Sequence, residues 1–120
     1  MRKEVTVEYI NSITEDLSRR DFTVNAMAFN PTVGLVDPYG GVIDIQRGLL
    51  SCVGVAEDRF NEDSLRILRA LRFASTKGFT IEYSTDRAIR AMYQQMSVLS
   101  AERILSELSK LLQGAGAYKV

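Results

Sequence analysis

The segment Val5–Ile10 constrains the fold most, because it is the longest predicted strand and has no evident partner. β-Branched or aromatic residues alternate with polar ones over its first positions, which is typical of a strand. Short apolar stretches at Gly34–Val36 and Ser51–Gly54 predict only small strands. A strand with a long unpaired edge seeks partners. We therefore expect the N-terminal part to be the trailing piece of a larger sheet, with the Val5–Ile10 edge available to a second chain or another copy.

The remaining chain is mainly helical by the spacing of its apolar residues, so the sequence predicts an α+β fold. A helix-like stretch over Thr14–Ala28 ends at Asn30-Pro31, since the residue before proline disfavours helix. A short helix is predicted within Val42–Leu50. Three later helices are predicted. The first is capped by Asn61 and ends near Lys77-Gly78, and the second begins after Ser84-Thr85-Asp86 and runs through Met92 to Met96. The third begins at Ser100, closes at Gly114 and Gly116, and turns its apolar side chains inward, which are Ile104, Leu105, Leu108, Leu111 and Leu112.

Composition excludes several classes of protein. Of the 120 residues, 46% are apolar and 25% charged, as in an ordinary globular domain with one core. No window holds the ~18 apolar residues of a membrane span, and the N-terminus lacks the apolar stretch of a signal peptide. Cys52 is the single cysteine and there is no histidine, which excludes an internal disulfide and a zinc site. We expect a cytoplasmic protein without a membrane partner, and Cys52 as a small buried side chain.

The charge balance limits how the chain could hold nucleic acid. Fifteen basic and fifteen acidic residues give a net charge of zero, whereas a surface that grips a polyanion widely carries a basic excess. Contact with nucleic acid must be local, or made mostly by another part of the molecule. A helical nucleic-acid-binding domain is disfavoured.

The first polar cluster, Arg19–Asn25, combines two arginines with an aspartate and an asparagine. Arginine holds phosphate with a fixed fork of donors, and Asp and Asn side chains suit a ribose hydroxyl. On spacing alone, a solvated helix face with an ion pair is the favoured interpretation.

The second cluster, Asp37–Asp44, contains adjacent glycines at 40 and 41, whose backbone freedom predicts a tight turn or a hinge. Its two aspartates are either metal ligands or turn caps.

The third cluster contains Glu62, Asp63 and Arg66, with Arg69 one turn further on. On a helix the first three project together. A carboxylate acceptor beside a guanidinium donor matches the edge of cytosine or adenine, which offers an amino donor next to a ring nitrogen. Guanine and uracil leave both protein groups unpaired, so such a site can reject them strongly. The alternative is a salt bridge that stabilises the helix by about 0.3–0.5 kcal/mol.

In order and spacing the clusters resemble the motifs of the class II tRNA nucleotidyltransferases (CCA-adding enzymes) and the related bacterial poly(A) polymerases. Arg19–Ala28 resembles the RRDxxxN motif, Asp37–Asp44 the hinge motif, Glu62–Ala74 the EDxxR motif, and Ser100–Lys110 the last head-and-neck motif. Four ordered motifs over nearly the whole chain are highly specific. The resemblance implies that residues 1–54 are the C-terminal part of a polymerase-β-like nucleotidyltransferase head, with one or a few short strands, and residues 55–120 a mainly helical neck.

The resemblance also implies a role for individual residues. The first group recognises ribose and triphosphate, the second selects CTP and ATP in place of a template strand, and the third forms the hinge or braces the selecting helix. The implied nucleotide-binding residues are Arg19, Arg20, Asp21, Asn25, Glu62, Asp63, Arg66 and Arg69. The implied hinge and support residues are Asp37, Gly40, Gly41, Asp44, Glu102, Arg103 and Glu107.

The implied reaction adds C and A from CTP and ATP to the tRNA 3′ end. In that family a DxD pair that binds Mg²⁺ precedes the RRDxxxN motif, and no DxD occurs in this chain. We expect Mg²⁺ only in the complete enzyme, no metal ligand or catalytic residue here, and no activity of the chain alone. The tRNA-binding body and tail would follow Gly116. The chain would be a truncated piece, the product of a broken gene, or half of a split enzyme.

Other functions remain open at this point. A poly(A) polymerase, or a relative that adds only C or only A, carries the same motifs. A non-catalytic nucleotide-binding or assembly module is the alternative of another class.

Overall fold

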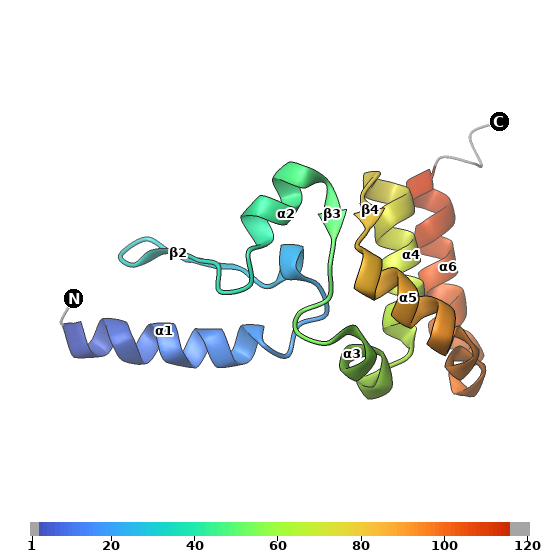
Figure 1. The fold of residues 1–120 in the computed structure, drawn as a ribbon, viewed down its shortest axis with the longest axis horizontal. Coiled ribbons are helices and arrows are strands. Elements are labelled where there is room, and N and C mark those ends of the chain that lie inside the picture. Colours follow the sequence, from blue (N-terminus) through green and yellow to red (C-terminus); the bar gives the residue numbers. More distant parts are fainter. Residues whose placement is uncertain (1–2, 116–120) are drawn as a thin grey trace.

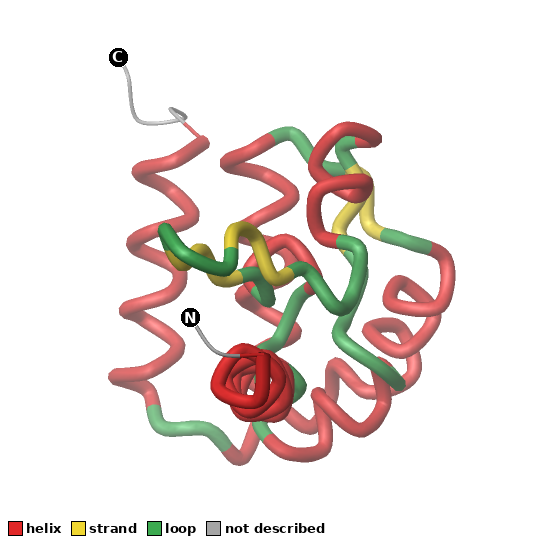
Figure 2. The backbone as a smooth tube through the Cα atoms, turned by 90° about the vertical axis from the view of Figure 1, so that its left-hand side faces the viewer, coloured by secondary structure: helices red, strands yellow, loops and turns green. Residues whose placement is uncertain are grey.

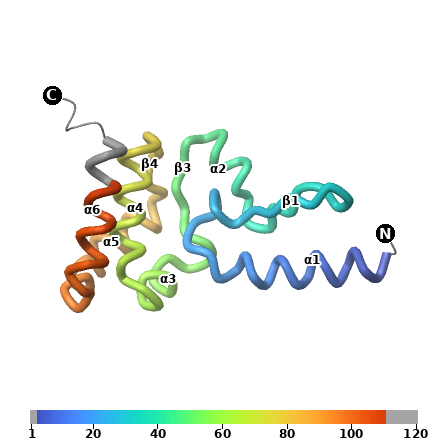
Figure 3. Tube along the Cα trace, turned by 180° about the vertical axis from the view of Figure 1, so that it is seen from behind, coloured from blue at the N-terminus to red at the C-terminus, as the bar shows by residue number. Residues whose placement is uncertain are grey.

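The computed structural model describes the backbone of residues 3–115 and the side chains of residues 3–110. The elements, in chain order, are α1 (Lys3–Leu17), the 3-10 helix η1 (Thr23–Asn25), β1 (Ala28–Asn30), β2 (Gly34–Val36), α2 (Gly41–Arg47), β3 (Leu49–Leu50), α3 (Ala56–Glu62), α4 (Leu65–Lys77), β4 (Thr80–Ile81), α5 (Tyr83–Met92), the 3-10 helix η2 (Tyr93–Val98) and α6 (Ala101–Ala115). The molecule is elongated, with extents of 53 × 33 × 28 Å (Figure 1). One end consists of α1 and the β1–β2 hairpin and the other of α3 to α6 (Figure 3).

The N-terminal segment is helical, so the predicted strand at Val5–Ile10 is wrong. In α1, Tyr9, Ile13 and Leu17 lie four residues apart on one side and pack in a cluster with residues of the β1–β2 region. Leu17 is only 2% exposed, and burial of such a side chain contributes about 1.5–3 kcal/mol. The β-branched residues that suggested a strand each cost a helix less than about 0.7 kcal/mol. The free energy of burial therefore outweighs the low helix propensity of the β-branched residues. Because Val5–Ile10 is helical, it offers no strand edge that could pair with a second chain or another copy.

The predicted helix over Thr14–Ala28 is also wrong after its first turn. Past the end of α1, the chain pairs with a distant segment instead of with itself. The Val53 N–H donates to the Asp21 carbonyl, and the Thr23 N–H donates to the Ser51 carbonyl, both at 2.9 Å. These bonds use the groups that a helix would satisfy internally.

The hairpin and α2 follow the prediction more closely. β2 confirms the strand expected at Gly34–Val36 and pairs antiparallel with β1. The chain then turns through Gly40, at φ 74°, into α2, which confirms a short helix within Val42–Leu50. This helix stops earlier than expected because Gly48, at φ 62°, ends it.

β3 joins the two ends of the molecule. It runs parallel to β4, with Leu49 opposite Thr80. The small strand expected at Ser51–Gly54 is therefore displaced toward the N-terminus. Within that range, Cys52 forms an isolated antiparallel bridge with Phe22.

The predicted helix capped by Asn61 is two helices. Asn61 lies inside α3, and the break falls at Asp63, which is extended at φ −158° and ψ 104°. The Asp63 carboxylate accepts the Leu65 N–H at 3.1 Å and so caps α4. The end predicted near Lys77-Gly78 is confirmed, since Gly78 lies at φ 71°.

α5 begins slightly earlier than predicted. Its cap is Glu82, whose carboxylate accepts the N–H groups of Ser84 and Thr85. The stretch Ser84-Thr85-Asp86 thus forms the first turn, and after Met92 the chain continues as η2.

α6 begins beside the predicted Ser100, whose Oγ accepts the Arg103 N–H at 3.3 Å. Leu105 is 63% exposed, so the expectation that it turns inward is wrong. Gly114 lies within α6 instead of ending it. The side chains of Leu111 and Leu112, and residue Gly116, lie outside the part that the structure describes.

Two clusters of buried side chains form the core. The smaller one lies between α1, the hairpin region and Val53, and the larger one joins the Phe22 segment to α3, α4 and α5. The larger cluster is made of Phe22, Val24, Leu50, Cys52, Ala56, Phe60, Ile67, Ala70, Ala88, Ile89 and Met92. Viewed nearly along α1, the β1–β2 pair lies apart from the β3–β4 pair (Figure 2).

The mixed architecture of helices and a few short strands confirms the predicted α+β class. Within residues 3–115, every helix is too short or too polar to cross a membrane.

Candidate functional site

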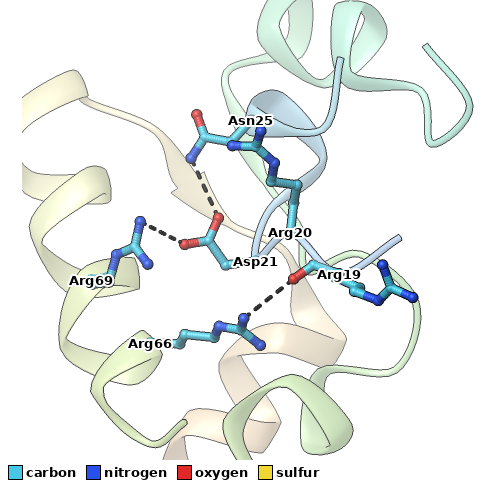
Figure 4. A pocket seen from close by; sticks show the side chains of 6 residues that line it. All are labelled: Arg19, Arg20, Asp21, Asn25, Arg66 and Arg69. Atoms are coloured by element: carbon cyan, nitrogen blue, oxygen red, sulfur yellow. Dashed lines mark hydrogen bonds and ion pairs between the residues drawn. The ribbon is translucent and has the colours of Figure 1, made fainter. Parts of the chain in front are cut away.

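A pocket of about 420 Å³ lies between the Arg19–Asn25 segment and α4. Four of its lining residues are arginines and one is an aspartate, which leaves a net charge of +3 on a chain that is neutral overall. The lining residues are Arg19, Arg20, Asp21, Asn25, Arg66 and Arg69 (Figure 4). Such a local concentration of guanidinium groups suits a multiply charged anion, phosphate above all.

Asp21 is the centre of the pocket and is only 5% exposed. Its Oδ1 accepts the N–H of Phe22 at 2.7 Å and, more weakly, the side-chain amide of Asn25 at 3.5 Å. Its Oδ2 lies 2.9 Å from Arg69 Nη2, but makes no hydrogen bond of good angle to a described residue. Asp21 Oδ2 is buried against Arg69, so the Asp21 carboxylate offsets part of the positive charge of the pocket.

The arginines of the pocket differ in how far their donors are engaged. Arg19 is exposed and pairs with Glu15 at 3.1 Å, on the solvent side of the pocket. Arg20 is exposed, and its side chain has no hydrogen bond or ion pair with any described residue. Arg66 contacts Glu62 through Nη1 at 2.9 Å and donates to the Arg19 carbonyl through Nη2 at 3.3 Å. Arg20 is thus the most available of the four for an incoming anion.

Asp63 lies at the α3–α4 break and is not among the residues that line the pocket. Its carboxylate is held by Arg103 Nη2 at 2.7 Å and by the Leu65 N–H. Burial alone would raise the pKa of Asp63, but these hydrogen bonds and the charges of Arg103 and Arg66 lower it below its usual value. Asp63 is therefore ionised at neutral pH and acts only as an acceptor.

The selecting group does not lie on one continuous helix as predicted. Glu62 is the last residue of α3 and Arg66 the second of α4, yet their side chains meet at 2.9 Å across the break. The break, which the sequence analysis missed, gives Asp63 a direction that a helical backbone would not.

Arg59 is a residue that the sequence analysis did not single out. It lies in α3, seven residues before Arg66, and its guanidinium donates to the Ser18 carbonyl and contacts Glu62. Its spacing of three from Glu62 on a predicted helix was the available signal. The bond to Ser18, 41 residues away, has no counterpart in the sequence pattern.

The predicted hinge residues lie beside the pocket segment and hold it. Asp37 accepts the N–H of Gly41 at 2.7 Å and so caps α2. The Thr23 hydroxyl donates to Asp44 at 2.5 Å. A Cβ on Gly41 would lie 2.3 Å from the Thr23 carbonyl, so only glycine allows this approach. Gly40, at φ 74°, makes the turn into the helix.

Two of the three predicted support residues link α6 to α4 and to the break before it. Glu107 is 6% exposed and pairs with Arg72 at 2.8 Å. Arg103 pairs with Asp63. Glu102 is exposed in the first turn of α6.

The sequence analysis named Asp37 and Asp44 as possible metal ligands. Among residues 3–115 there is no group of three or more Asp, Glu, Cys or His side chains placed to hold an ion. Asp37 accepts the Gly41 N–H and so caps α2, and Asp44 accepts the Thr23 hydroxyl.

Burial raises the pKa of the Cys52 thiol to about 11, so the thiol carries no charge at neutral pH.

Two protein-family profiles match the chain. The profile described as "Poly A polymerase head domain" matches residues 1–51. The one described as "Probable RNA and SrmB- binding site of polymerase A" matches residues 78–120.

Proteins of known identity that are similar to this chain include CCA-adding enzymes. That of Lactiplantibacillus plantarum is 45% identical over 113 residues, which are 94% of this chain and 28% of that enzyme. The crystal structure of the Bacillus stearothermophilus CCA-adding enzyme in complex with CTP is 43% identical, with a TM-score of 0.84 over 89% of this chain and 27% of that one. The Thermotoga maritima CCA-adding enzyme complexed with tRNA-CCA is 36% identical, with a TM-score of 0.77 over 84% of this chain and 26% of that one. The chain thus spans about 28% of the length of the curated relatives it matches.

Proposed function

Because the chain belongs to the nucleotidyltransferase family of the CCA-adding enzymes and bacterial poly(A) polymerases, we propose that it is the nucleotide-selecting part of an enzyme that adds C and A to tRNA 3′ ends from CTP and ATP. The arginine-rich pocket carries this proposal. It joins the two motifs that resemble RRDxxxN and EDxxR in one cavity, although Arg19 and Arg66 are 47 residues apart. In this division residues 1–54 belong to the head and residues 55–120 to the neck.

The triphosphate and ribose would bind at the RRDxxxN side of the pocket. Arg20 has free donors for a phosphate group, and Arg19 and Arg69 add positive charge around it. Asp21 would accept a ribose hydroxyl, because it is the one carboxylate among the described residues that line the pocket. The amide of Asn25 keeps the same carboxylate in place.

The base would be selected by Asp63 and Arg66, with Glu62 and Arg103 as their supports. A carboxylate offers about four lone-pair positions and a guanidinium five N–H donors, so each residue keeps capacity for a base beyond its present contacts. Asp63 accepts the amino group of cytosine or adenine, and Arg66 donates to the neighbouring ring nitrogen. Guanine or uracil would place a carbonyl against the Asp63 carboxylate and an N–H against the Arg66 guanidinium, so neither protein group would be paired.

Mg²⁺ belongs to the proposed reaction but finds no ligand set in the described residues. Two-metal phosphoryl transfer needs carboxylates that align the 3′-hydroxyl and the leaving pyrophosphate. Those would have to come from residues outside this chain, and we expect the chain alone to be inactive. The family assignment, and the reduced state of its one buried cysteine, support a cytoplasmic site of action.

Titration with the four ribonucleoside triphosphates tests the proposed selection. We expect CTP and ATP to bind at least roughly tenfold more tightly than GTP and UTP, because the latter leave two protein groups unpaired. Asp63→Ala and Arg66→Ala should remove the preference, whereas Arg90→Ala, on exposed α5, should keep it. Equal affinity of the wild type for all four would contradict the proposal, and a preference for ATP alone or CTP alone would indicate an A-only, poly(A) or C-only enzyme.

A separate assay tests the expected inactivity. The purified chain should incorporate no CMP or AMP into tRNA with Mg²⁺ present. Incorporation without a second polypeptide would show that the metal-binding carboxylates lie within these residues after all.

A further inference from the structure

Arg59 is a largely buried arginine for which the proposed function has no use. Only 17% of its side chain is exposed, and it extends from α3 to the turn that precedes the pocket. There its Nη1 donates to the Ser18 carbonyl. Its Nη2 donates to Glu62 Oε2 at 3.2 Å, and its Nε lies 2.8 Å from Glu62 Oε1 as an ion pair without a hydrogen bond of good angle. One guanidinium thus joins a carboxylate in α3 to a backbone carbonyl of a distant turn.

Arg59 reaches Arg66 by two routes. Glu62 Oε1, which faces Arg59 Nε, also lies 2.9 Å from Arg66 Nη1. The backbone carbonyl of Arg59 accepts a second hydrogen bond from the same Nη1, at 3.3 Å. Arg66 Nη2 donates to the Arg19 carbonyl, so the two arginines end on adjacent carbonyls of one turn.

This arrangement requires an arginine at position 59. A guanidinium presents its donors in a fixed plane, so Nη2 can bind Glu62 Oε2 while Nη1 binds the Ser18 carbonyl. A lysine would keep the positive charge, but as a point charge it would leave Glu62 free to rotate. Arg66 would then lose one of the contacts that orient it.

We infer, on the basis of the proposed function, that Arg59 is a positioning residue for nucleotide selection. By fixing Glu62 and offering its own carbonyl, Arg59 sets the direction in which the Arg66 guanidinium meets the base. Selection by hydrogen bonds depends on this direction, because a hydrogen bond weakens steeply as its angle departs from linear. The general attraction of the pocket for a triphosphate does not depend on it, since Arg19, Arg20 and Arg69 are unaffected.

Arg59→Lys tests the inference in the full 120-residue chain. Affinities for CTP, ATP, GTP and UTP are measured by calorimetric titration, with circular dichroism to confirm the fold. We expect the preference for CTP and ATP to fall by roughly tenfold, the scale of one well-directed hydrogen bond, while GTP and UTP bind within about threefold of the wild type. Arg90→Lys is the matched control: Arg90 Nε also contacts a carboxylate of its own helix, Asp86 at 2.9 Å, but on exposed α5. Arg90→Lys should change neither the preference for CTP and ATP nor the affinities for GTP and UTP.

A double-mutant cycle with Arg66→Lys shows whether Arg59 acts through Arg66. If it does, Arg59→Lys has no further effect on the preference once Arg66 is replaced. An equal effect of Arg59→Lys in both backgrounds would overturn the inference. So would a folded Arg59→Lys chain that keeps the wild-type preference, or one that loses affinity for all four nucleotides alike.

The outcomes also separate this inference from the proposed function. A wild type without any preference refutes the proposed function itself, whereas a wild type with a preference that survives Arg59→Lys refutes only the role of Arg59. If Arg59→Lys does not fold, Glu62→Gln takes its place in the cycle, because it loosens the same fork from the carboxylate side and leaves Arg59 present. The same loss of preference, absent in the Arg66→Lys background, is then expected, and its absence counts against the inference.

Discussion

At the scale of single residues, Gly41 shows how closely α2 approaches the pocket segment. Gly41→Ala places a Cβ 2.3 Å from the Thr23 carbonyl, and backbone cannot yield as a flexible side chain can. We expect a loss of about 1–3 kcal/mol in the free energy of unfolding, as for overpacking elsewhere. Urea denaturation followed by circular dichroism measures it.

The neighbouring Gly40 provides the control for this substitution. Gly40 needs glycine for its φ of 74° and not for space, since nothing lies within 4 Å of a Cβ there. Asn tolerates this conformation, so Gly40→Asn should cost less than about 1 kcal/mol. A larger loss at position 40 than at position 41 would mean that backbone conformation, not the contact with Thr23, is the constraint.

Cys52 predicts how stability depends on alkaline pH. Burial raises the pKa of its thiol to about 11 in the folded chain, above the value of about 8.5 in an unfolded one. The fold therefore favours the protonated thiol, and this contribution is complete below about pH 8.5 and lost as the pH rises through about 11. Wild type should lose more of its free energy of unfolding over this interval than Cys52→Ala, whose other titrating groups are the same. Parallel curves for the two proteins would contradict it.

The residues of the pocket were easier to predict than their partners. The resemblance to the family motifs implied that Arg19, Arg20, Asp21, Asn25, Arg66 and Arg69 bind the nucleotide, and these six residues line one cavity. The pairing of Asp63 with Arg103 joins residues 40 apart. Local spacing contains no information about such contacts, because they depend on how α6 packs on α4.

At the scale of elements, the link between α6 and α4 depends on a buried ion pair. Glu107→Gln removes the charge that faces Arg72 at 2.8 Å and leaves a guanidinium only 24% exposed without its carboxylate. We expect the free energy of unfolding to fall by about 1–3 kcal/mol, less than for a fully buried pair because Arg72 keeps some solvent. Urea denaturation compares this variant with the wild type.

The pair of Asp86 and Arg90 on α5 is the exposed counterpart. Arg90 is 78% exposed, so Asp86→Asn should change stability by no more than about 0.5 kcal/mol. Equal losses in the free energy of unfolding for Glu107→Gln and Asp86→Asn would show that burial does not strengthen the ion pair of Glu107 with Arg72.

Sequence reasoning placed most helices in the second half of the chain, but in the first half it placed only α2. α4 and α6 have clear caps and a regular apolar stripe, so local signals sufficed for the end of one and the start of the other. α1 was predicted as a strand because the first positions of Val5–Ile10 alternate, whereas its packing depends on Tyr9, Ile13 and Leu17 over a longer span. The predicted helix after α1 failed for the opposite reason, since its backbone is committed to the segment at residues 51–53.

At the scale of the whole molecule, ligand binding and folding should be coupled. CTP that binds only the folded chain adds about 2.7 kcal/mol to its stability when free CTP is about 100 times its Kd. Thermal unfolding at increasing CTP concentrations should show a corresponding rise in Tm. Arg69→Ala, which removes the ion pair to Asp21, should reduce this rise, and a Tm that does not respond to CTP in the wild type would contradict the prediction.

The two walls of the pocket come from stretches that no local structure brings together. The Arg19–Asn25 wall is held by the chain at residues 51–53, and the α4 wall is held through the parallel pairing of β3 with β4. In a folding intermediate that has formed its helices but not these long-range pairings, the pocket residues are not yet brought together and the nucleotide site is not formed. Nucleotide affinity therefore reports that assembly of the chain is complete, and during refolding it should return with the slowest phase and not with the helical signal.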